Sequence, residues 1–387
     1  MNMNSFEWYN PTKIIFGEDS FEKISKEIPK NARILVTYGG GSIFKNGIYD
    51  AIKKQLDGFY VEEFGGIEPN PTYQTLKKAI ELIKTNDLNF ILAVGGGSVI
   101  DGTKFISAGV LFEGDSWEIP KKGIRVEKAM PFGTVLTLPA TGSEMNSGAV
   151  ITNKETGEKL GMGSPYLFPK FSICNPSVIK SLPKTQIQNG IIDAFTHVLE
   201  QYVTYPIGAS LQDRISESIL KTLIEITPKL LNEPYNVTTA SNFMYSCTMA
   251  LNGQIQKGVP TDWATHMIGH ELTAHFNIDH ARTLAIIMPN LYRVKFENKK
   301  EKLAQMAEHV FNIEKTDTNI MAEKAIESLE AFYKEIEMPY KISDYTKEGN
   351  GISEKIKETF ISRNWLGLGE RKDISPDEVE KIVEMSL

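Results

Sequence analysis

Short apolar runs alternate with segments of helical periodicity along residues 1–180 of this 387-residue chain. The runs are ARILVTY (32–38), FYVEEF (59–64), NFILAV (89–94), GTVLTL (133–138) and FSICN (171–175), and amphipathic segments at 43–56 and 72–85 separate the first three. Strands that alternate with helices are typical of βαβ units in a parallel sheet. NFILAV has no polar alternation, as expected of a central strand that is buried on both faces.

The pattern changes after Leu182-Pro183, where strand-like runs nearly vanish and long helical periods follow at 184–203, 211–231 and through 241–275. The last helix opens with Ser375, a proline and two acidic residues, which predicts a capping box. A chain of this length usually forms more than one domain. We therefore predict an α/β domain with a Rossmann-like parallel sheet over residues 1–180 and an all-helical domain over residues 181–387.

Charge and composition argue against several classes of partner. The formal net charge is -7 and the basic residues are scattered, so we expect no nucleic-acid binding. No apolar run approaches the roughly 18–20 residues that span a bilayer, and the N-terminus lacks the features of a signal peptide. Cys174 and Cys247 lie far apart in apolar contexts, which is typical of buried free thiols in a reducing compartment. We therefore expect a cytoplasmic protein without membrane association.

The tetrapeptide GGGS occurs twice, at 39–42 and 95–98, each time between a predicted strand and a predicted helix. Three glycines let a ligand approach the backbone, and a helix start offers N–H groups and the positive end of its dipole. Each turn alone is equally well explained as a tight βα turn with a capped helix, and Ser98 and Asp101 fit a capping box. Two such turns in one α/β domain favour a dinucleotide or another polyphosphate.

Neither turn has the usual dinucleotide fingerprint, because Phe44 and Ile100 occupy the third glycine position, and neither continues as a Walker loop. The first turn has no acidic residue before Asp50. NAD sites commonly place a carboxylate at the adenosine ribose, which would repel a 2′-phosphate. If this turn holds that ribose, NADP(H) is favoured.

The loops at 65–71 and 136–151 also follow strands. The ligand crevice of an open α/β sheet lies at such positions, although the residues of these loops are ordinary loop formers.

Histidines are concentrated in one region, since four of the six lie within THMIGHELTAHFNIDH (265–280). Upstream, Asp193 and His197 are four residues apart and share a helix face, as either a buried pair or two metal ligands. His266 and His270 have the same spacing, and His280 follows a predicted helix break at 276–279. Asp193, His197 and two or more of the later histidines would make a four-ligand site suited to Zn²⁺ or Fe²⁺.

The letters HELTAH suggest a zincin metalloprotease, but that motif needs histidines four residues apart. His270 and His275 are five apart and point about 140° away from each other on a helix. We therefore reject that motif and expect His275 to take no part in metal binding. His309 reads as an ordinary helix residue.

A glycine-rich cofactor domain followed by a helical metal domain resembles the iron-containing alcohol dehydrogenase family. The resemblance covers nearly the whole chain and is carried by PTKIIFG (11–17), GGIEPNP (65–71), VGGGSVIDGTK (94–104), LPATGSEMN (138–146), DAFTH (193–197) and GHELTAHFNIDHA (269–281). The YGGGS turn is similar to that of the branch of NADPH-dependent butanol dehydrogenases and broad-range aldehyde reductases.

The resemblance implies a set of site residues. Fe²⁺ or Zn²⁺ would be held by Asp193, His197, His266 and His280. His270 would face the nicotinamide and the substrate, and Asp101 would lie near the nicotinamide ribose; these two are the catalytic candidates. The implied NADP(H) contacts are Gly39, Gly40, Gly41, Ser42, Asn70, Gly96, Gly97, Ser98, Asp101, Thr137, Thr141, Asn146 and Lys159.

The implied reaction is hydride transfer between NADP(H) and small primary alcohols or aldehydes, such as butanol and butanal, in a homodimer. One alternative is a dehydroquinate-synthase-like lyase, or a glycerol-dehydrogenase-like enzyme, on a related scaffold. Such a lyase needs a cluster of Lys and Arg beside the metal, which residues 190–200 and 262–282 lack. A metal hydrolase would leave the two GGGS turns unexplained, and a non-enzymatic binding protein would leave the metal ligands without a purpose.

Overall fold

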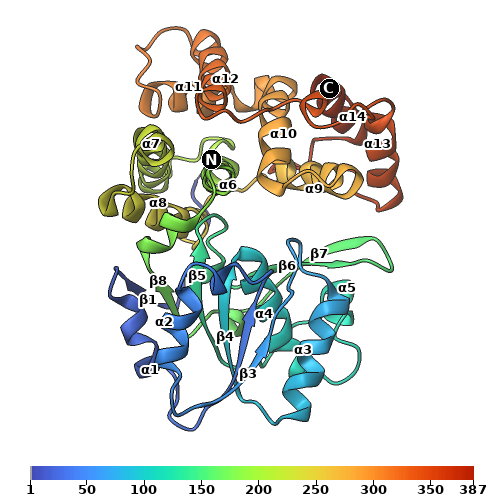
Figure 1. The fold of residues 1–387 in the computed structure, drawn as a ribbon. Helices are drawn as coiled ribbons and strands as arrows, with labels where there is room; N and C mark the ends of the chain where they lie inside the picture. Colours follow the sequence, from blue (N-terminus) through green and yellow to red (C-terminus); the bar gives the residue numbers. More distant parts are fainter. Residues whose placement is uncertain (1) are drawn as a thin grey trace. The chain divides into compact units, whose positions relative to one another are not determined.

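The computed structural model describes residues 2–387 and divides the chain into two compact units (Figure 1). The α/β unit contains Tyr9–Pro183 and Tyr235–Asn252. The helical unit contains the N-terminal residues up to Trp8, Lys184–Pro234 and Gly253–Leu387. The chain therefore changes unit at 183/184, near the expected boundary of 180, but it also crosses at three further places, 8/9, 234/235 and 252/253. Within residues 2–387, no helix is long and apolar enough to cross a membrane.

The α/β unit is built on a parallel sheet whose strands follow the order β1-β8-β5-β4-β2-β3. The strands are β1 (Lys13–Phe16), β2 (Arg33–Tyr38), β3 (Tyr60–Phe64), β4 (Phe90–Gly96), β5 (Phe132–Leu138) and β8 (Phe171–Cys174). Five of them match the apolar runs in the sequence, so the predicted fold class is confirmed. β4 is buried along Phe90–Gly95, as its lack of polar alternation predicts.

The sheet reverses its strand order at β2, which pairs with β3 on one side and β4 on the other. In an open α/β sheet, ligands bind outside the carboxyl ends of the strands at such a reversal. Both GGGS turns follow this rule, since one leaves the end of β2 and the other leaves the end of β4. The topology therefore places the two turns on neighbouring strands at the same edge.

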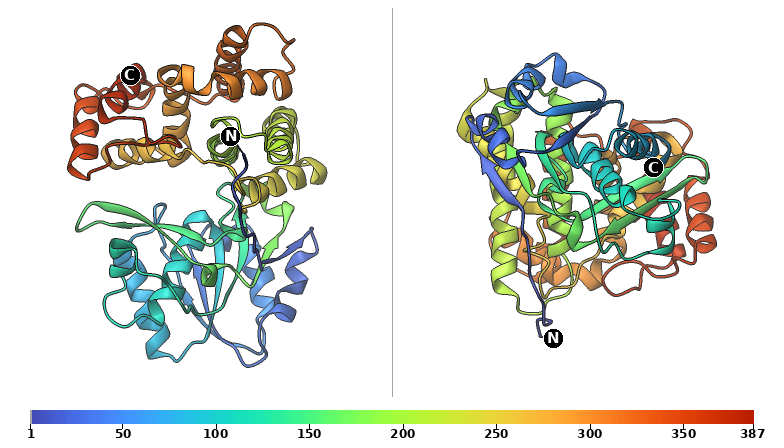
Figure 2. Two further views of the ribbon diagram at one scale, coloured as in Figure 1. Left: turned by 180° about the vertical axis from the view of Figure 1, so that it is seen from behind. Right: turned by 90° about the horizontal axis from the view of Figure 1, so that it is seen from below.

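The helices of this unit are α1 (Ile24–Glu27), α2 (Ile48–Gln55), α3 (Tyr73–Thr85), α4 (Gly97–Val110), α5 (Glu118–Lys122) and α8 (Val237–Ala250). α4 is buried over most of its length and packs on β4, α3 and β6 (Gly148–Asn153). β6 and β7 (Glu158–Gly163) form an antiparallel hairpin that the sequence did not predict. The hairpin extends away from the parallel sheet in Figure 1 and in the left view of Figure 2.

The helical unit contains α6 (Lys184–Tyr202), α7 (Ser210–Asn232), α9 (Ala264–Phe276), α10 (His280–Val294), α11 (Phe296–His309), α12 (Thr318–Glu335), α13 (Ile352–Ser362) and α14 (Pro376–Met385). α10 is its central helix, because it packs against α6, α9, α12 and α14. α6 is buried continuously from Ile187 to Tyr202. α14 begins with the predicted capping box, in which Ser375 and Glu378 each accept from the other's backbone N–H.

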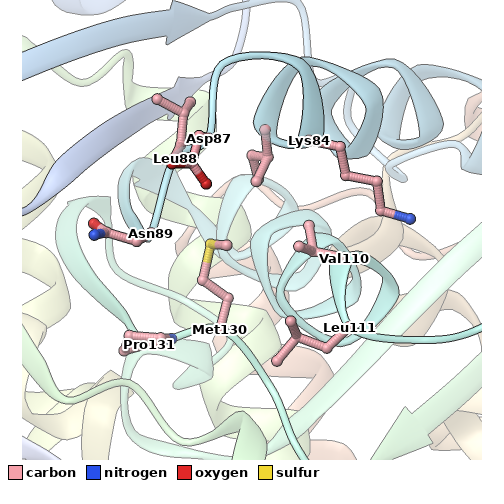
Figure 3. A pocket seen from close by; sticks show the side chains of 9 residues that line it. Lys84, Asp87, Leu88, Asn89, Val110, Leu111, Met130 and Pro131 are labelled. Atoms are coloured by element: carbon pink, nitrogen blue, oxygen red, sulfur yellow. The ribbon is translucent and has the colours of Figure 1, made fainter.

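A cavity of about 400 Å³ lies at the amino ends of β4 and β5, whereas the glycine turns follow the carboxyl ends of β2 and β4. Figure 3 shows residues that line the cavity. Asp87, Leu88 and Asn89 line it just before β4, and Pro131 lines it just before β5. These are the amino ends of parallel strands, so the cavity is not the crevice where a nucleotide is expected.

Candidate active site

Three helices of the helical unit bring the predicted metal ligands together. Oδ1 of Asp193 on α6 lies 3.7 Å from Nδ1 of His197 and 3.7 Å from Nε2 of His280. Ligand atoms of Asp193, His266 and His280 all lie within 4.8 Å of one another. The ring of His197 stacks on that of His266, with 4.7 Å between centroids. The four residues form one cluster.

The break between α9 and α10 makes this cluster possible. Asn277 adopts a left-handed φ of 54° at the end of α9, and α10 begins at His280, so the predicted break is confirmed. Gly269 lets the two helices approach closely, because a Cβ there would lie 2.9 Å from Oγ1 of Thr283. The approach brings the first residue of α10 beside His266 on α9.

The donor set fits a divalent metal. One carboxylate and three imidazoles are ligands that both Zn²⁺ and Fe²⁺ accept. Burial lowers the pKa of His197 to about 4, against a smaller opposing effect of Asp193, so its imidazole is neutral near pH 7 and keeps a lone pair for a metal. His280 is the most exposed of the four, with a side chain 28% accessible against 4% for Asp193. A cluster that is open on one side is typical of catalytic metal sites.

Glu200 is a residue of the site that sequence reasoning missed. Its carboxylate is buried and contacts Nδ1 of His266. Burial raises the pKa of Glu200, the neighbouring Asp262 raises it further, and backbone N–H groups oppose both effects. The spacing of Asp193, His197 and Glu200 was a usable signal, because residues at i, i+4 and i+7 share one helix face.

The remaining histidines take the positions that helix periodicity predicts. The ring of His270 lies 5.1 Å from that of His280 and 6.3 Å from that of His266, beside the cluster. His275, in the last turn of α9, is exposed. Trp263 was also missed by the sequence reasoning, although its ring lies 5.4 Å from that of His266. Its φ of 66° is unusual for a bulky residue and holds the indole at the start of α9.

The predicted cofactor residues lie in the α/β unit. In the first turn, Gly41 has a left-handed φ of 87°, and Gly40 and Ser42 are exposed. In the second turn, a Cβ at Gly97 would lie 2.5 Å from the side chain of Thr141, so only glycine fits there. Thr137 lies near the end of β5 and is half-buried. Each of these positions is at the carboxyl edge of the sheet.

The capping box predicted at Ser98 and Asp101 is wrong. α4 begins directly after β4, with Gly96 at the N-cap position and no side-chain cap, and Ser98 already lies inside the helix. Asp101 instead accepts hydrogen bonds from Oγ of Ser143 (2.5 Å) and the N–H of Val150 (3.0 Å). The first turn of α4 is thus left with backbone N–H groups that suit an anion.

Lys104 ties the loop after β5 to α4. Its ammonium donates to Ser143 (2.7 Å), to Oδ1 of Asn146 (2.8 Å) and to the carbonyl of Gly148 (2.7 Å). Burial lowers the pKa of Lys104 to about 8, although Asp101 opposes the effect. The predicted contact Asn146 therefore also has a structural role.

The hairpin adds a second pair of predicted contacts. Nζ of Lys159 on β7 lies 3.0 Å from Oδ1 of Asn70, which itself has a left-handed φ of 57°. The structure therefore brings together two residues that lie far apart in the sequence.

Family models match the chain over both units. Residues 11–176 match "Iron-containing alcohol dehydrogenase", and residues 187–387 match "Fe-containing alcohol dehydrogenase family, C-terminal". The chain belongs to the iron-containing alcohol dehydrogenase family. The family predicted from the sequence motifs is thus confirmed, and membership makes the chain an oxidoreductase of alcohols and aldehydes.

Relatives match along the full length of the chain. The NADPH-dependent aldehyde reductase YqhD of Escherichia coli is 46% identical over 99% of each chain. A probable NADH-dependent butanol dehydrogenase 1 of Bacillus subtilis is 42% identical over 100% of each. The crystal structure of Escherichia coli YqhD superimposes with a TM-score of 0.97 at 44% identity, covering 100% of both chains. That of the NADH-dependent butanol dehydrogenase A of Thermotoga maritima gives 0.94 at 35% identity, covering 100% of this chain and 99% of the other.

Proposed function

We propose that the protein transfers hydride between NADP(H) and small primary alcohols or aldehydes, such as butanol and butanal, with a divalent metal at Asp193, His197, His266 and His280. The observation that carries the proposal is the convergence of one carboxylate and three imidazoles from three helices in a member of this family. The lyase, hydrolase and binding-protein alternatives have no comparable support.

The residues of the chain and the bound groups would have different roles in the reaction. When bound, the metal would polarise the carbonyl oxygen, and the nicotinamide would supply or accept the hydride. His197, whose imidazole is neutral near pH 7, would hold the ion together with Asp193, His266 and His280. His270 lies beside the cluster at its open side, and its ring nitrogens are suited to exchange a proton at the product oxygen.

The α/β unit would bind the dinucleotide. Gly96, Gly97 and Ser98 are the proposed pyrophosphate contacts, because α4 begins there without a side-chain cap. Asp101 would meet the nicotinamide ribose, and its carboxylate is already fixed by Ser143. The other proposed contacts are Thr137, Thr141, Asn146, Asn70 and Lys159.

The first turn, Gly39–Ser42, favours NADP(H) over NAD(H). It offers exposed backbone at Gly40 and a hydroxyl at Ser42, without the carboxylate that would repel a 2′-phosphate. Names of relatives alone do not decide the cofactor. YqhD is called NADPH-dependent and an Entamoeba histolytica enzyme at 40% identity is called NADP-dependent, whereas two Bacillus subtilis relatives are called NADH-dependent.

A spectrophotometric screen tests the proposal. Metal-stripped protein, reloaded with Fe²⁺ or Zn²⁺, is given butanal with NADPH or NADH. We expect turnover only after metal is restored, and faster oxidation of NADPH than of NADH. Full activity without metal would refute the metal site, and equal rates with both cofactors would refute the role of the first turn.

Assembly and location are part of the same proposal. We expect a cytoplasmic homodimer, in line with the family resemblance. Cys174 and Cys247 are both buried and form no disulfide bond, which agrees with a reducing compartment. Light scattering on the purified protein would detect the dimer, and a monomeric mass would refute it.

A further inference from the structure

Glu200 on α6 meets the start of α9 with both of its carboxylate oxygens. Oε1 accepts hydrogen bonds from the backbone N–H of Thr265 (2.7 Å) and of His266 (3.3 Å). Oε2 contacts Nδ1 of the His266 ring. The side chain is 2% accessible, so water does not replace these partners. The carboxylate of Glu200 therefore accepts from the first turn of α9 and contacts the imidazole of His266 at the same time.

A second layer of buried charge holds Glu200 in place. The N–H of Asp262 donates to the carbonyl of Glu200 (2.8 Å), and Oδ2 of Asp262 pairs with Nζ of Lys299 (2.6 Å). Lys299 also pairs with Glu370 (3.1 Å) and donates to the carbonyl of Val203 (2.9 Å). Hydrogen bonds and ion pairs of Asp262 and Lys299 thus connect the backbone at the end of α6 to the backbone just before α9. These connections restrict movement on both sides of the Glu200–His266 contact.

The contact at Nδ1 decides which ring nitrogen of His266 can bind a metal. A neutral imidazole has one N–H donor and one lone pair. If Nδ1–H donates to Glu200, the lone pair is on Nε2. Carboxylates that orient metal-bound histidines in this way commonly change metal affinity when they are mutated.

We propose that Glu200 is a positioning residue that holds His266 in its Nδ1–H tautomer and thereby sets the metal affinity of the cluster. The inference rests on the proposed metal site. The competing explanation is purely structural, namely that Glu200 only caps the first turn of α9.

Glu200→Gln separates the two roles. The amide has one oxygen, which can accept from the two backbone N–H groups or from the imidazole, but not from all three in the present arrangement. With the oxygen on the backbone, the amide NH₂ faces Nδ1, which must then accept and leave the proton on Nε2. A capping role predicts that Glu200→Gln is almost neutral, whereas a positioning role predicts a flipped tautomer and weaker metal binding.

Two measurements test this on the full-length protein. Long-range ¹H–¹⁵N correlation spectra of the metal-free protein report the tautomer of His266, assigned with His266→Ala. Competition with a chromophoric chelator reports the dissociation constant for Zn²⁺. The matched control is Glu217→Gln, since Glu217 is a buried carboxylate of the same unit that accepts from Tyr202 (2.9 Å) and Gln305 (2.7 Å).

We expect the Nδ1–H tautomer in the wild type, a shift toward Nε2–H in Glu200→Gln, and about 10- to 100-fold weaker Zn²⁺ binding. Glu217→Gln should keep the wild-type tautomer and affinity. An unchanged tautomer and affinity in Glu200→Gln would overturn the inference. If the wild type itself bound no Zn²⁺, the proposed metal site would fail, and the tautomer in the metal-free protein would still decide the role of Glu200.

Discussion

Gly40→Asp places a carboxylate where we propose that the 2′-phosphate of NADP(H) binds. The substitution should not disturb the fold. Gly40 is exposed, its φ is not in the left-handed region, and a Cβ there would meet no heavy atom within 4 Å. The backbone around it is also anchored, because Gly66 and Ile67 donate to the carbonyls of Gly39 (3.0 Å) and Tyr38 (3.2 Å). Any effect should therefore come from the added charge.

The size of the effect follows from electrostatics. Two like unit charges about 4 Å apart repel by about 1 kcal/mol in water and about 4 kcal/mol near a protein surface of lower effective dielectric constant. Because Gly40 is exposed, we expect a value of about 1–3 kcal/mol. That range corresponds to roughly 5- to 150-fold weaker binding of NADPH. NADH has a 2′-hydroxyl that can donate to the new carboxylate, so its binding should be unchanged or tighter.

Fluorescence titration of NADPH and NADH into the purified variant measures both dissociation constants, and steady-state rates with butanal give the matching KM values. Gly40→Ala is the control, and it should bind both cofactors like the wild type. Raising the salt concentration should reduce the penalty for NADPH, because exposed charges are screened. Equal weakening of NADPH and NADH, or no weakening of either, would show that this turn does not hold the adenosine ribose.

Three further predictions concern the cluster and its surroundings. His280→Ala should lose both metal and turnover, His275→Ala should keep both, and His270→Ala should keep metal while turnover slows; metal analysis that finds His275→Ala depleted would refute the helix-phase reasoning. Gly269→Ala should destabilise the protein by about 1–3 kcal/mol in denaturant unfolding and weaken Zn²⁺ binding, because the new Cβ would push α9 away from α10; wild-type affinity would contradict this. The pKa of Lys104 is about 8 in the folded state, against 10.5 for the ordinary side chain. At a pH between these two pKa values, Lys104 therefore binds fewer protons in the folded state than in the unfolded state. The unfolding free energy of the wild type relative to Lys104→Met should therefore rise from pH 8 to 10.5, by up to about 3 kcal/mol at 1.36 kcal/mol per pKa unit, and a flat difference would refute the shifted pKa.

The sequence predicted the features that depend on local periodicity. Buried strands such as β4 and long helices such as α6 have apolar patterns that local sequence determines. The break between α9 and α10 was also predictable, and so was the grouping of Asp193 with histidines some seventy residues later. Histidine is rare in this chain, and its concentration in residues 265–280 indicated a shared site before any contact between these residues was known.

Features that depend on tertiary context were not predictable. Strand β6 begins in a stretch whose Gly, Ser and Asn residues are typical of a loop, and the strand with which it pairs, β7, comes later in the chain. Ser98 and Asp101 match a capping box in sequence, but β4 runs directly into α4 and Asp101 is taken by Ser143. Glu200 shares a face with two predicted ligands, yet its importance comes from its contact with α9.

The cluster also bears on how the chain responds to losing its metal. Asp193 and His197 come from α6, His266 from α9 and His280 from α10, so an ion bound to all four would act as a cross-link between segments far apart in the chain. A cross-link of that kind restricts the unfolded chain, and binding energy at such a site becomes folding energy. Removal of the metal by a chelator should therefore loosen α9 and α10 first, and faster amide hydrogen exchange in these two helices would report it. The glycine turns of the α/β unit contain none of these ligands and should keep their protection.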